Sequence, residues 1–473
     1  MSQSFITIVK KVKERNDMNA ELCFTQGAEL AHKGDALQAL ELFHQAISLK
    51  PDYAEAYNGI GALLININNL NEAEFYLQRA LELKVDYPEA LFNLGTLFSR
   101  TSLLEEAEVC LRETISLQPD FPEAHFRLGM VLKQMERLDE AEKHLVLSIR
   151  LRTDFKEAEF ALGVLYLLQG QYEKGWKGYE LRRRIFNTCD SRCNWKVEDL
   201  TGQKIVLFHE QGFGDAIHFV RYVKEIEKVA SEVVLFIPEQ LKRLISASFK
   251  SITIETDEKM VGDYNFSCPL PSLPYMFRTT LDTIPSPISY LKADSNLISK
   301  WSEIVKKEIK DHSFTIGVAW AGNPNHKNDK NRSIPFHVFK QLFSLQTVNW
   351  ISLQMDEKAA DLQTVSHQVL DFHENISDFA ETAGLIENLD LVITVDTAVA
   401  HLAGALGKDT WLLLPIDPDW RWQVKGQESL WYPTIRIFRQ IHRGDWQGVL
   451  AEVITNLEAK LKRNNQFNKI KGN

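Results

Sequence analysis

Apolar and small residues recur every 34 positions through the first part of the chain. Frames of 34 residues begin five times, at Ala20, Ala54, Pro88, Pro122 and Lys156. The eighth position of every frame is glycine and the twentieth is small, as shown by Gly27, Gly61, Gly95, Gly129 and Gly163, and by Ala39, Ala73, Ala107, Ala141 and Gly175. A fixed period of this length predicts a solenoid, in which each unit packs on its neighbours.

Each frame contains two amphipathic helical patterns. In the second frame, the two apolar faces consist of Tyr57, Ile60, Gly61 and Leu64, and of Leu70, Ala73, Leu77 and Ala80. This spacing, with Pro-Asp at frame ends, resembles the tetratricopeptide repeat (TPR) over residues 20–189. The resemblance implies a TPR superhelix, an α/α solenoid, whose concave surface holds a protein or peptide partner. A homodimer formed through the repeats is the alternative use of that surface.

The ends of the repeat array need a cover, because a repeat cannot bury its apolar faces alone. Residues 1–19 predict a short capping helix with a polar face. The fifth frame departs from the pattern after Gly175, where the chain reads GWKGYELRRRIF. We expect Trp176, Tyr179 and Leu181 to form a seam with the next domain, and the arginines 182–184 to be a solvated helix face.

The pattern changes after a linker at 190–203. Residues 204–209 predict a strand, EQGFGD a glycine turn, 216–229 a helix and 232–238 a further strand. This order indicates a parallel sheet with crossover helices. A second series has strands at 314–320, 348–354, 390–395 and 410–415, with a helix at 377–389 for which Ser377 is the expected N-cap.

The solenoid is therefore expected to precede two Rossmann-like α/β domains that face each other across a cleft. The expected segments are a capping helix at 1–19, five repeats at 20–189, a first α/β domain at 190–293, a linker helix at 294–311, a second α/β domain at 312–445, and a C-terminal helix and tail at 446–473.

Glycines and polar residues gather directly after the predicted strands. They are Gly212, Gly214 and Asp215 after the first strand, the loop from Asn323 to Arg332, the pair Asp396 and Thr397, and the pair Asp417 and Asp419. Ligands of open parallel sheets bind outside the carboxyl ends of the strands. We therefore expect these loops to form one site.

Six motifs in order carry a second resemblance, namely EQGFGDAIHFVRY, GVAWAGNPNHKND, RSIP, DLVITVDTAVAHLAGALG, LLLPIDPDWRW and WYPTIRIFRQ. Over residues 190–450 they resemble glycosyltransferases of the heptosyltransferase type, in glycosyltransferase family 9. The resemblance implies the GT-B fold and an inverting transfer of a sugar from a nucleotide-diphosphate donor, usually without a metal. It places the donor on the C-terminal domain and the acceptor on the N-terminal one. The union of repeats with such a pair is also similar to the architecture of protein O-GlcNAc transferases. A non-catalytic TPR scaffold with a degenerate α/β half is the alternative.

Inverting transfer needs a group that takes the acceptor hydroxyl proton. Asp215 lies at the glycine turn, and the resemblance gives the aspartate of that motif this role; its alternative role is the N-cap of a helix starting at Ala216. His218, one turn further, is the alternative base, although a helical histidine is more often packed or solvated.

The departing diphosphate needs positive charge and backbone N–H groups. Thr397 and Ala398 open a predicted helix, and helix N-termini attract phosphate. His401 lies one turn further and could reach a phosphate oxygen, or belong to the core. Asp396 suits sugar or ribose hydroxyls, or the capping of this helix.

Cationic side chains of the loop after 314–320 would neutralise the diphosphate in the absence of a metal. The candidates are Lys327, Lys330 and Arg332, which otherwise belong to a solvated loop. The remaining candidates are Gln354 for the base, and Trp420 and Arg421 for the nucleotide or acceptor, with domain packing as their alternative role. We expect no metal at Asp417 and Asp419.

Composition narrows the class of protein. The 473 residues carry a net charge of −10, which argues against a dedicated nucleic-acid binder. The five cysteines include one close pair, Cys189 and Cys193, without a second pair that would complete a zinc site. The N-terminus lacks an apolar signal segment, and we found no run long enough to span a membrane. These features predict a cytoplasmic protein. The sugar, the nucleotide and the acceptor stay open.

Overall fold

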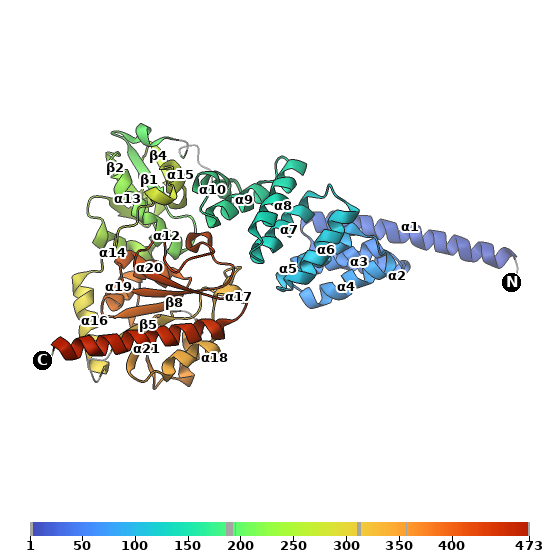
Figure 1. Cartoon of the computed structure of the whole chain (residues 1–473). Coiled ribbons are helices and arrows are strands. Elements are labelled where there is room, and N and C mark those ends of the chain that lie inside the picture. Colours follow the sequence, from blue (N-terminus) through green and yellow to red (C-terminus); the bar gives the residue numbers. More distant parts are fainter. Residues whose placement is uncertain (1–2, 186–192, 194, 310–313, 356, 472–473) are drawn as a thin grey trace. The chain divides into compact units, whose positions relative to one another are not determined.

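The computed structural model describes residues 3–185, 193, 195–309, 314–355 and 357–471 (Figure 1). The chain divides into two compact units, Met1–Leu162 and Gly163–Asn473.

The first unit consists of helix pairs, so the predicted solenoid is confirmed. Its helices are α1 (Gln3–Lys33), α2 (Ala36–Leu49), α3 (Ala54–Asn66), α4 (Leu70–Leu83), α5 (Pro88–Arg100), α6 (Leu104–Leu117), α7 (Pro122–Gln134) and α8 (Leu138–Leu151), and α9 (Lys156–Leu168) crosses into the second unit. The separate capping helix expected at 1–19 is wrong. The stretch from Gln3 to Lys33 has no proline and one glycine, so α1 continues unbroken into the first repeat.

The glycine at the eighth position is required by the packing of each helix pair. A Cβ on Gly61 would lie 2.6 Å from Leu77 Cγ, and a Cβ on Gly95 would lie 2.8 Å from Leu111 Cγ. These leucines are fully buried. The missing side chain thus lets the two helices of one repeat approach closely.

The turn between the two helices of each repeat has a left-handed residue at the same place in all five frames. The φ values are 90° for Gly34, 65° for Asn68, 66° for Ser102, 58° for Glu136 and 79° for Gly170. Glycine and, less readily, asparagine adopt this conformation, whereas serine and glutamate do so under strain.

Aromatic pairs in the first unit join the first helix of a frame to the last residue of the same frame, just before the next helix pair. Ring centroids of Phe24 and Tyr53 lie 5.3 Å apart, and those of Phe92 and Phe121 lie 5.1 Å apart. The second frame has Asn58 at the equivalent position, where its amide donates to the Tyr87 hydroxyl at 3.4 Å. The polar Asn58 therefore keeps a contact with Tyr87 at the position where the other frames have an aromatic pair.

The second unit contains two parallel sheets, as the sequence predicted. The four-stranded sheet has the order β3-β2-β1-β4 and the six-stranded sheet the order β10-β9-β8-β5-β6-β7. The strands are β1 (Lys204–Phe208), β2 (Glu232–Phe236), β3 (Thr253–Glu255), β4 (Phe266–Pro269), β5 (Phe314–Ala319), β6 (Val348–Ser352), β7 (Val369–Leu370), β8 (Leu391–Val395), β9 (Thr410–Leu414) and β10 (Ile435–Arg439).

Helices connect and cover these strands (Figure 1). They are α10 (Tyr172–Tyr179), α11 (Arg182–Ile185), α12 (Phe213–Phe219), α13 (Val223–Ile226), α14 (Glu239–Ser248), α15 (Leu273–Met276), α16 (Ser295–Glu308), α17 (Asp329–Arg332), α18 (Phe336–Phe339), α19 (Phe379–Glu387), α20 (Ala398–Leu406) and α21 (Trp446–Lys471). One apolar core joins a face of the six-stranded sheet to α18 and α21. On the same sheet, α20 packs against β8 and β9.

Two helix predictions in this unit need correction. The helix expected at 216–229 begins at Phe213, and the 3-10 turn Val220–Tyr222 interrupts it. The expected N-cap of α19, Ser377, is also wrong, because the Asp378 carboxylate accepts from the N–H groups of Ala380 and Glu381, each at 3.0 Å. Aspartate competes well for this position and satisfies two N–H groups at once.

Candidate functional site

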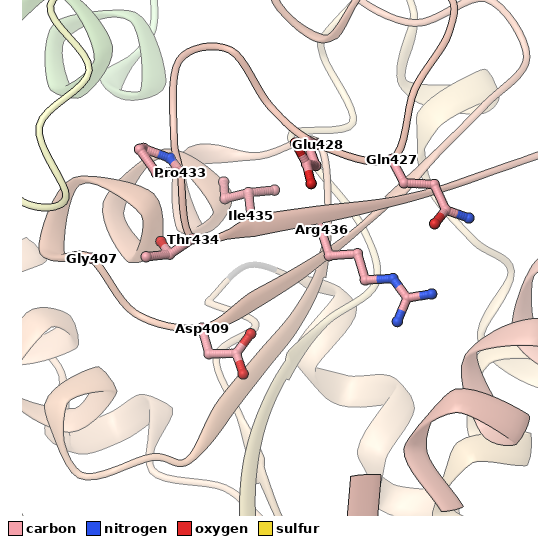
Figure 2. A pocket seen from close by; sticks show the side chains of 8 residues that line it. All are labelled: Gly407, Asp409, Gln427, Glu428, Pro433, Thr434, Ile435 and Arg436. Atoms are coloured by element: carbon pink, nitrogen blue, oxygen red, sulfur yellow. The ribbon is translucent and has the colours of Figure 1, made fainter. Parts of the chain in front are cut away.

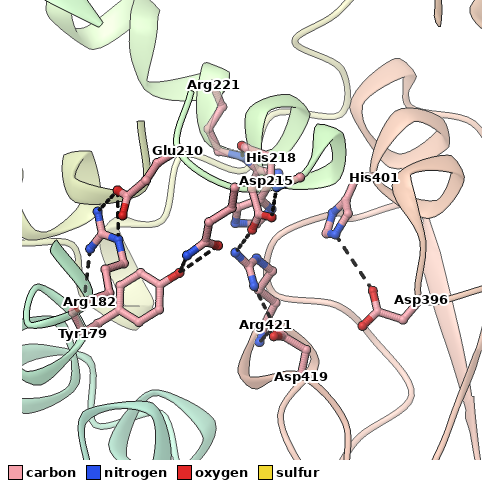
Figure 3. Close-up of polar contacts among 12 residues, drawn as sticks. Tyr179, Arg182, Glu210, Asp215, His218, Arg221, Asp396, His401, Asp419 and Arg421 are labelled. Carbon is pink, nitrogen blue, oxygen red and sulfur yellow. Dashed lines mark hydrogen bonds and ion pairs between the residues drawn. The ribbon is translucent and has the colours of Figure 1, made fainter. Parts of the chain in front are cut away.

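Asp215 and Arg421 form an ion pair between segments that follow strands of different sheets (Figure 3). Asp215 lies in the first turn of α12, and Arg421 lies in the 3-10 turn Trp420–Trp422. The Asp215 Oδ1 lies 2.5 Å from the Arg421 Nη2, and the Oδ2 accepts from the Gly212 N–H at 3.1 Å. Asp215 is the third residue of α12 and not its N-cap, so the capping role expected for it is wrong in detail. Its side chain is 23% exposed, which leaves it reachable from solvent.

The surroundings of Asp215 combine burial with one strong cation. Burial raises the pKa of Asp215 above its ordinary value, while Arg421 opposes that rise and Asp419 adds to it. Arg421 also pairs with Asp419 at 2.8 Å and lies 4.4 Å from the Trp420 ring. Arg421 and the Gly212 N–H therefore fix the direction of this carboxylate, and burial makes it more basic than one in water.

His218 belongs to a buried hydrogen-bonded chain. Its Nδ1 lies 2.9 Å from the Tyr432 hydroxyl, which lies 2.8 Å from the His401 Nδ1. Tyr432 has one proton to donate, so one of the two imidazoles must donate to it. Burial lowers the pKa of both histidines well below the usual value, which makes both neutral. His218 is fully buried, whereas part of the Asp215 side chain is open to solvent.

The start of α20 lies against the glycine turn. A Cβ on Gly214 would lie 2.9 Å from the His401 Cδ2 and 3.6 Å from the Ala398 Cα, so this approach requires glycine. Thr397 is the N-cap residue of α20. The structure thus brings the predicted base and the predicted phosphate-binding helix start together.

Asp396 and Arg332 complete this side of the site. The Asp396 carbonyl accepts from the Arg332 Nη1 at 3.0 Å, and the Asp396 Oδ1 lies 3.9 Å from the His401 Nε2. Burial, helped by Asp419, raises the pKa of Asp396 to about 6, and Arg332 opposes the rise. Arg332 also pairs with Asp329 at 3.3 Å.

The other loop candidates lie on the surface of the loop after β5. Lys327, Lys330 and Asn323 are exposed, and the side chain of Asn323 accepts from the Asn325 N–H at 2.9 Å. His326 was missed by the sequence reasoning. Partial burial and the charge of Arg332 lower its pKa, and the charges of Asp329, Asp419 and Asp215 act on it in the opposite direction. Its place inside the NPNHKND motif was the signal that could have identified it.

Gln354 and Trp420 have structural roles here. The buried Gln354 side chain accepts from the N–H groups of Trp320 and Ala321 and donates to the Ala321 carbonyl at 3.0 Å, so it holds the loop after β5 instead of facing a nucleotide base. Trp420 is buried, and its ring centroid lies 5.2 Å from Trp176 and 5.8 Å from Tyr179. The aromatic seam predicted for the fifth repeat is therefore present.

The burial of Arg182 contradicts another expectation from the sequence. The sequence placed arginines 182–184 on a solvated face, but the Arg182 side chain has no exposed surface. It pairs with Glu180 at 2.6 Å and with Glu210 at 3.0 Å. Two carboxylates compensate the buried guanidinium, whereas Arg184 is exposed as predicted.

A cavity of about 460 Å³ lies beside the amino-terminal ends of β9 and β10, at the end of the six-stranded sheet opposite to the loops described above (Figure 2). Its lining consists of Gly407, Asp409, Gln427, Glu428, Pro433, Thr434, Ile435 and Arg436. None of the predicted site residues lies there. In the described part of the chain, no three histidine, cysteine, aspartate or glutamate side chains gather as a metal site would require.

Comparison with known families settles the nature of the helical part. The tetratricopeptide repeat family matches residues 30–94 and again residues 122–155. The chain carries tetratricopeptide repeats. Among the described helices of this TPR protein, none is both long and apolar enough to cross a bilayer.

Several proteins are similar to parts of this TPR chain. Protein FlbA of Caulobacter vibrioides is 22% identical over 336 residues, which cover 62% of the chain and 54% of FlbA. The match thus spans about half of that relative. Among solved structures, PilF of Pseudomonas aeruginosa has a TM-score of 0.33 and 20% identity, and the match covers 36% of this chain and 77% of PilF. TTC0263 of Thermus thermophilus has a TM-score of 0.32 and 22% identity, with 36% of this chain and 97% of TTC0263 covered. The TPR protein YrrB has a TM-score of 0.30 and 23% identity, with 37% of this chain and 91% of YrrB covered.

Proposed function

We propose that the two parallel sheets form a GT-B pair that transfers a sugar, with inversion and without a metal, from a nucleotide-diphosphate donor to an acceptor. The observation that carries the proposal is the position of Asp215, paired with Arg421 and separated from the start of α20 by the glycine turn alone. The six sequence motifs that resemble heptosyltransferases supply these residues.

Asp215 is the proposed base. Arg421 favours its ionised form and aims its carboxylate, and the burial that raises its pKa improves its affinity for the acceptor proton. The carboxylate keeps lone pairs for a hydroxyl beyond its bonds to Arg421 and the Gly212 N–H.

The diphosphate would lie at the N-terminus of α20. Backbone N–H groups of the first turn there lack partners within the helix, and the helix dipole favours an anion. Arg332 supplies a cation next to Asp396. Asp396 itself would face sugar or ribose hydroxyls, because a carboxylate repels phosphate. The repeats would hold a protein or peptide acceptor.

Release of nucleoside diphosphate from a panel of UDP-, GDP-, ADP- and dTDP-sugars tests the proposal. We expect turnover with at least one donor, and a loss of about a hundredfold or more in Asp215→Asn. The exposed Asp263 gives the matched control, since Asp263→Asn should keep the full rate. No turnover with any donor, or equal rates in Asp215→Asn and the control, would sink the proposal. Nucleotide binding without turnover would favour the non-catalytic scaffold.

A further inference from the structure

The end of the fifth repeat contacts the loop that carries Asp215. Arg182, in α11, directs its guanidinium at Glu210, with the Nη2 at 3.0 Å and the Nε at 3.2 Å from the Glu210 Oε2 (Figure 3). The two side chains are 0% and 6% exposed. Glu210 lies only two residues before Gly212, whose N–H binds Asp215.

The guanidinium itself is fixed from several directions. Its Nη1 pairs with Glu180 at 2.6 Å, and its Nη2 donates to the Ser272 hydroxyl at 2.6 Å. That hydroxyl donates in turn to Glu180 at 2.9 Å. The Tyr179 ring lies 4.7 Å from the guanidinium, and the Tyr179 hydroxyl lies 3.4 Å from the Gln211 amide. Two consecutive loop residues are therefore anchored on the last helices of the repeats.

The same helices also contact the other partner of the ion pair. Trp420, which precedes Arg421, packs on Trp176 and Tyr179. The fifth repeat thus holds both the loop of Asp215 and the segment of Arg421. A buried charge-assisted contact of this kind fixes geometry strongly, because removing one partner leaves an uncompensated charge.

We propose that Arg182, acting through Glu210, is a positioning residue for Asp215, so that the fifth repeat is part of the reaction centre. The catalytic meaning of this inference rests on the proposed function, but the geometric claim stands on the contacts alone. Arg182 does not touch the reacting atoms. It sets where the Asp215 carboxylate points relative to Arg421.

The charges around Asp215 make its pKa a measure of how the carboxylate is positioned. Burial raises the pKa of Asp215, Arg421 and Arg182 lower it, and Asp419 adds to the rise. When the loop loosens, Asp215 moves from Arg421, and its pKa rises because burial is less compensated.

The test is a ¹³C NMR titration of Asp215 in the full chain with labelled aspartate carboxyls, assigned with Asp215→Asn. In Glu210→Gln, which keeps the shape and removes the charge, we expect the pKa of Asp215 to rise by about half a unit or more. The rate of nucleotide release should fall at least about tenfold, with the KM for the donor unchanged. Arg182→Lys should restore part of the rate lost in Arg182→Gln.

The exposed Arg184 supplies the control, since Arg184→Gln should change neither the pKa nor the rate. If Arg182→Gln fails to fold, Glu210→Gln still decides. An unchanged pKa of Asp215 in folded Glu210→Gln overturns the inference, even in an active enzyme. A raised pKa in a protein that turns over no donor overturns the proposed function and leaves the geometric claim in place.

Discussion

At the scale of single residues, the fold changes how readily Asp396 loses its proton. Its pKa is raised to about 6, above the ordinary 3.8, because it is buried and Asp419 is near. Between these two pH values the native chain keeps a proton that the unfolded chain has lost. The stability that depends on this group is therefore present at low pH and falls as the pH rises towards 6.

Asp396→Asn mimics the protonated form and should raise the free energy of unfolding at pH 7 by about 1–3 kcal/mol. At pH 4 the gain should nearly vanish. Urea unfolding at the two pH values measures the difference, with Asp263→Asn as an exposed control. An equal effect at both pH values would show that the carboxyl is not perturbed.

For His144, in the fourth repeat, stability changes with pH in the opposite direction to that expected for Asp396. The His125 Nε2 lies 3.0 Å from the Pro119 carbonyl and must donate to it, so the His125 Nδ1 accepts from the His144 Nδ1 at 3.0 Å. Burial and the neighbouring His125 lower the pKa of His144 to about 4. Stability that depends on His144 is thus present above pH 6.5 and is lost as the pH falls towards 4.

A ¹H–¹³C NMR titration of the histidine rings should place the pKa of His144 near 4. In His125→Leu the pKa of His144 should move up, because the repelling neighbour is gone. A pKa near 6.5 in the intact chain would contradict the pairing.

The positions of candidate residues were predictable only where a motif fixes them locally. The glycine turn marked Asp215, and the helix start marked Thr397. The partner of Asp215 could not be found this way, because Arg421 is 206 positions away and sits in a loop whose packing depends on the last repeat. The burial of Arg182 escaped notice for the same reason, since its partner Glu210 belongs to another element.

At the scale of elements, the left-handed turn residue of each repeat offers a direct stability test. Ser102 has a φ of 66°, where Gly34 and Gly170 stand in the first and fifth frames. Ser102→Gly should raise the free energy of unfolding by about 0.5–1 kcal/mol, because glycine adopts this conformation without strain.

Ser99→Gly is the matched control for that change. The same substitution inside α5 should lower the free energy of unfolding by about 0.5–1 kcal/mol. Thermal unfolding of both variants gives the comparison. Destabilisation by Ser102→Gly would contradict the assigned turn.

Elements followed from the sequence when a period or an apolar run was long enough. Helices α3, α5, α7 and α9 begin at the expected frame starts, and six strands begin within one residue of their expected positions. Strands β3, β4, β7 and β10 were missed. In β3 and β7, three and two residues carry no detectable period. The break after α12 was missed because Val220 and Tyr222 continue a helical apolar pattern and are both buried.

At the scale of the whole molecule, the fifth repeat belongs with the sheets. Trp431 donates to the Tyr172 hydroxyl at 3.0 Å, and Trp176 donates to the Thr279 carbonyl at 2.8 Å. A chain that starts at residue 190 lacks both aromatic partners and Arg182. The boundary expected at 189 therefore cuts through a buried seam.

A fragment of residues 156–473, which starts with α9, should fold and unfold cooperatively. A fragment of 190–473 should aggregate or lose more than about 5 kcal/mol, since each buried aromatic removed from a core costs about 3–5 kcal/mol. Circular dichroism melting and size-exclusion chromatography compare the two. Equal melting temperatures would show that the last repeat is dispensable.

The central claim is that one carboxylate, Asp215, activates the acceptor while the sugar leaves a diphosphate held at α20. The most direct measurement is the anomeric configuration of the first-formed product, followed by ¹H NMR during turnover of the best donor. The account predicts an inverted configuration that appears before mutarotation, and its loss in Asp215→Asn. A retained configuration would contradict the account, because retention requires a second attack on the sugar that Asp215 as a base does not provide.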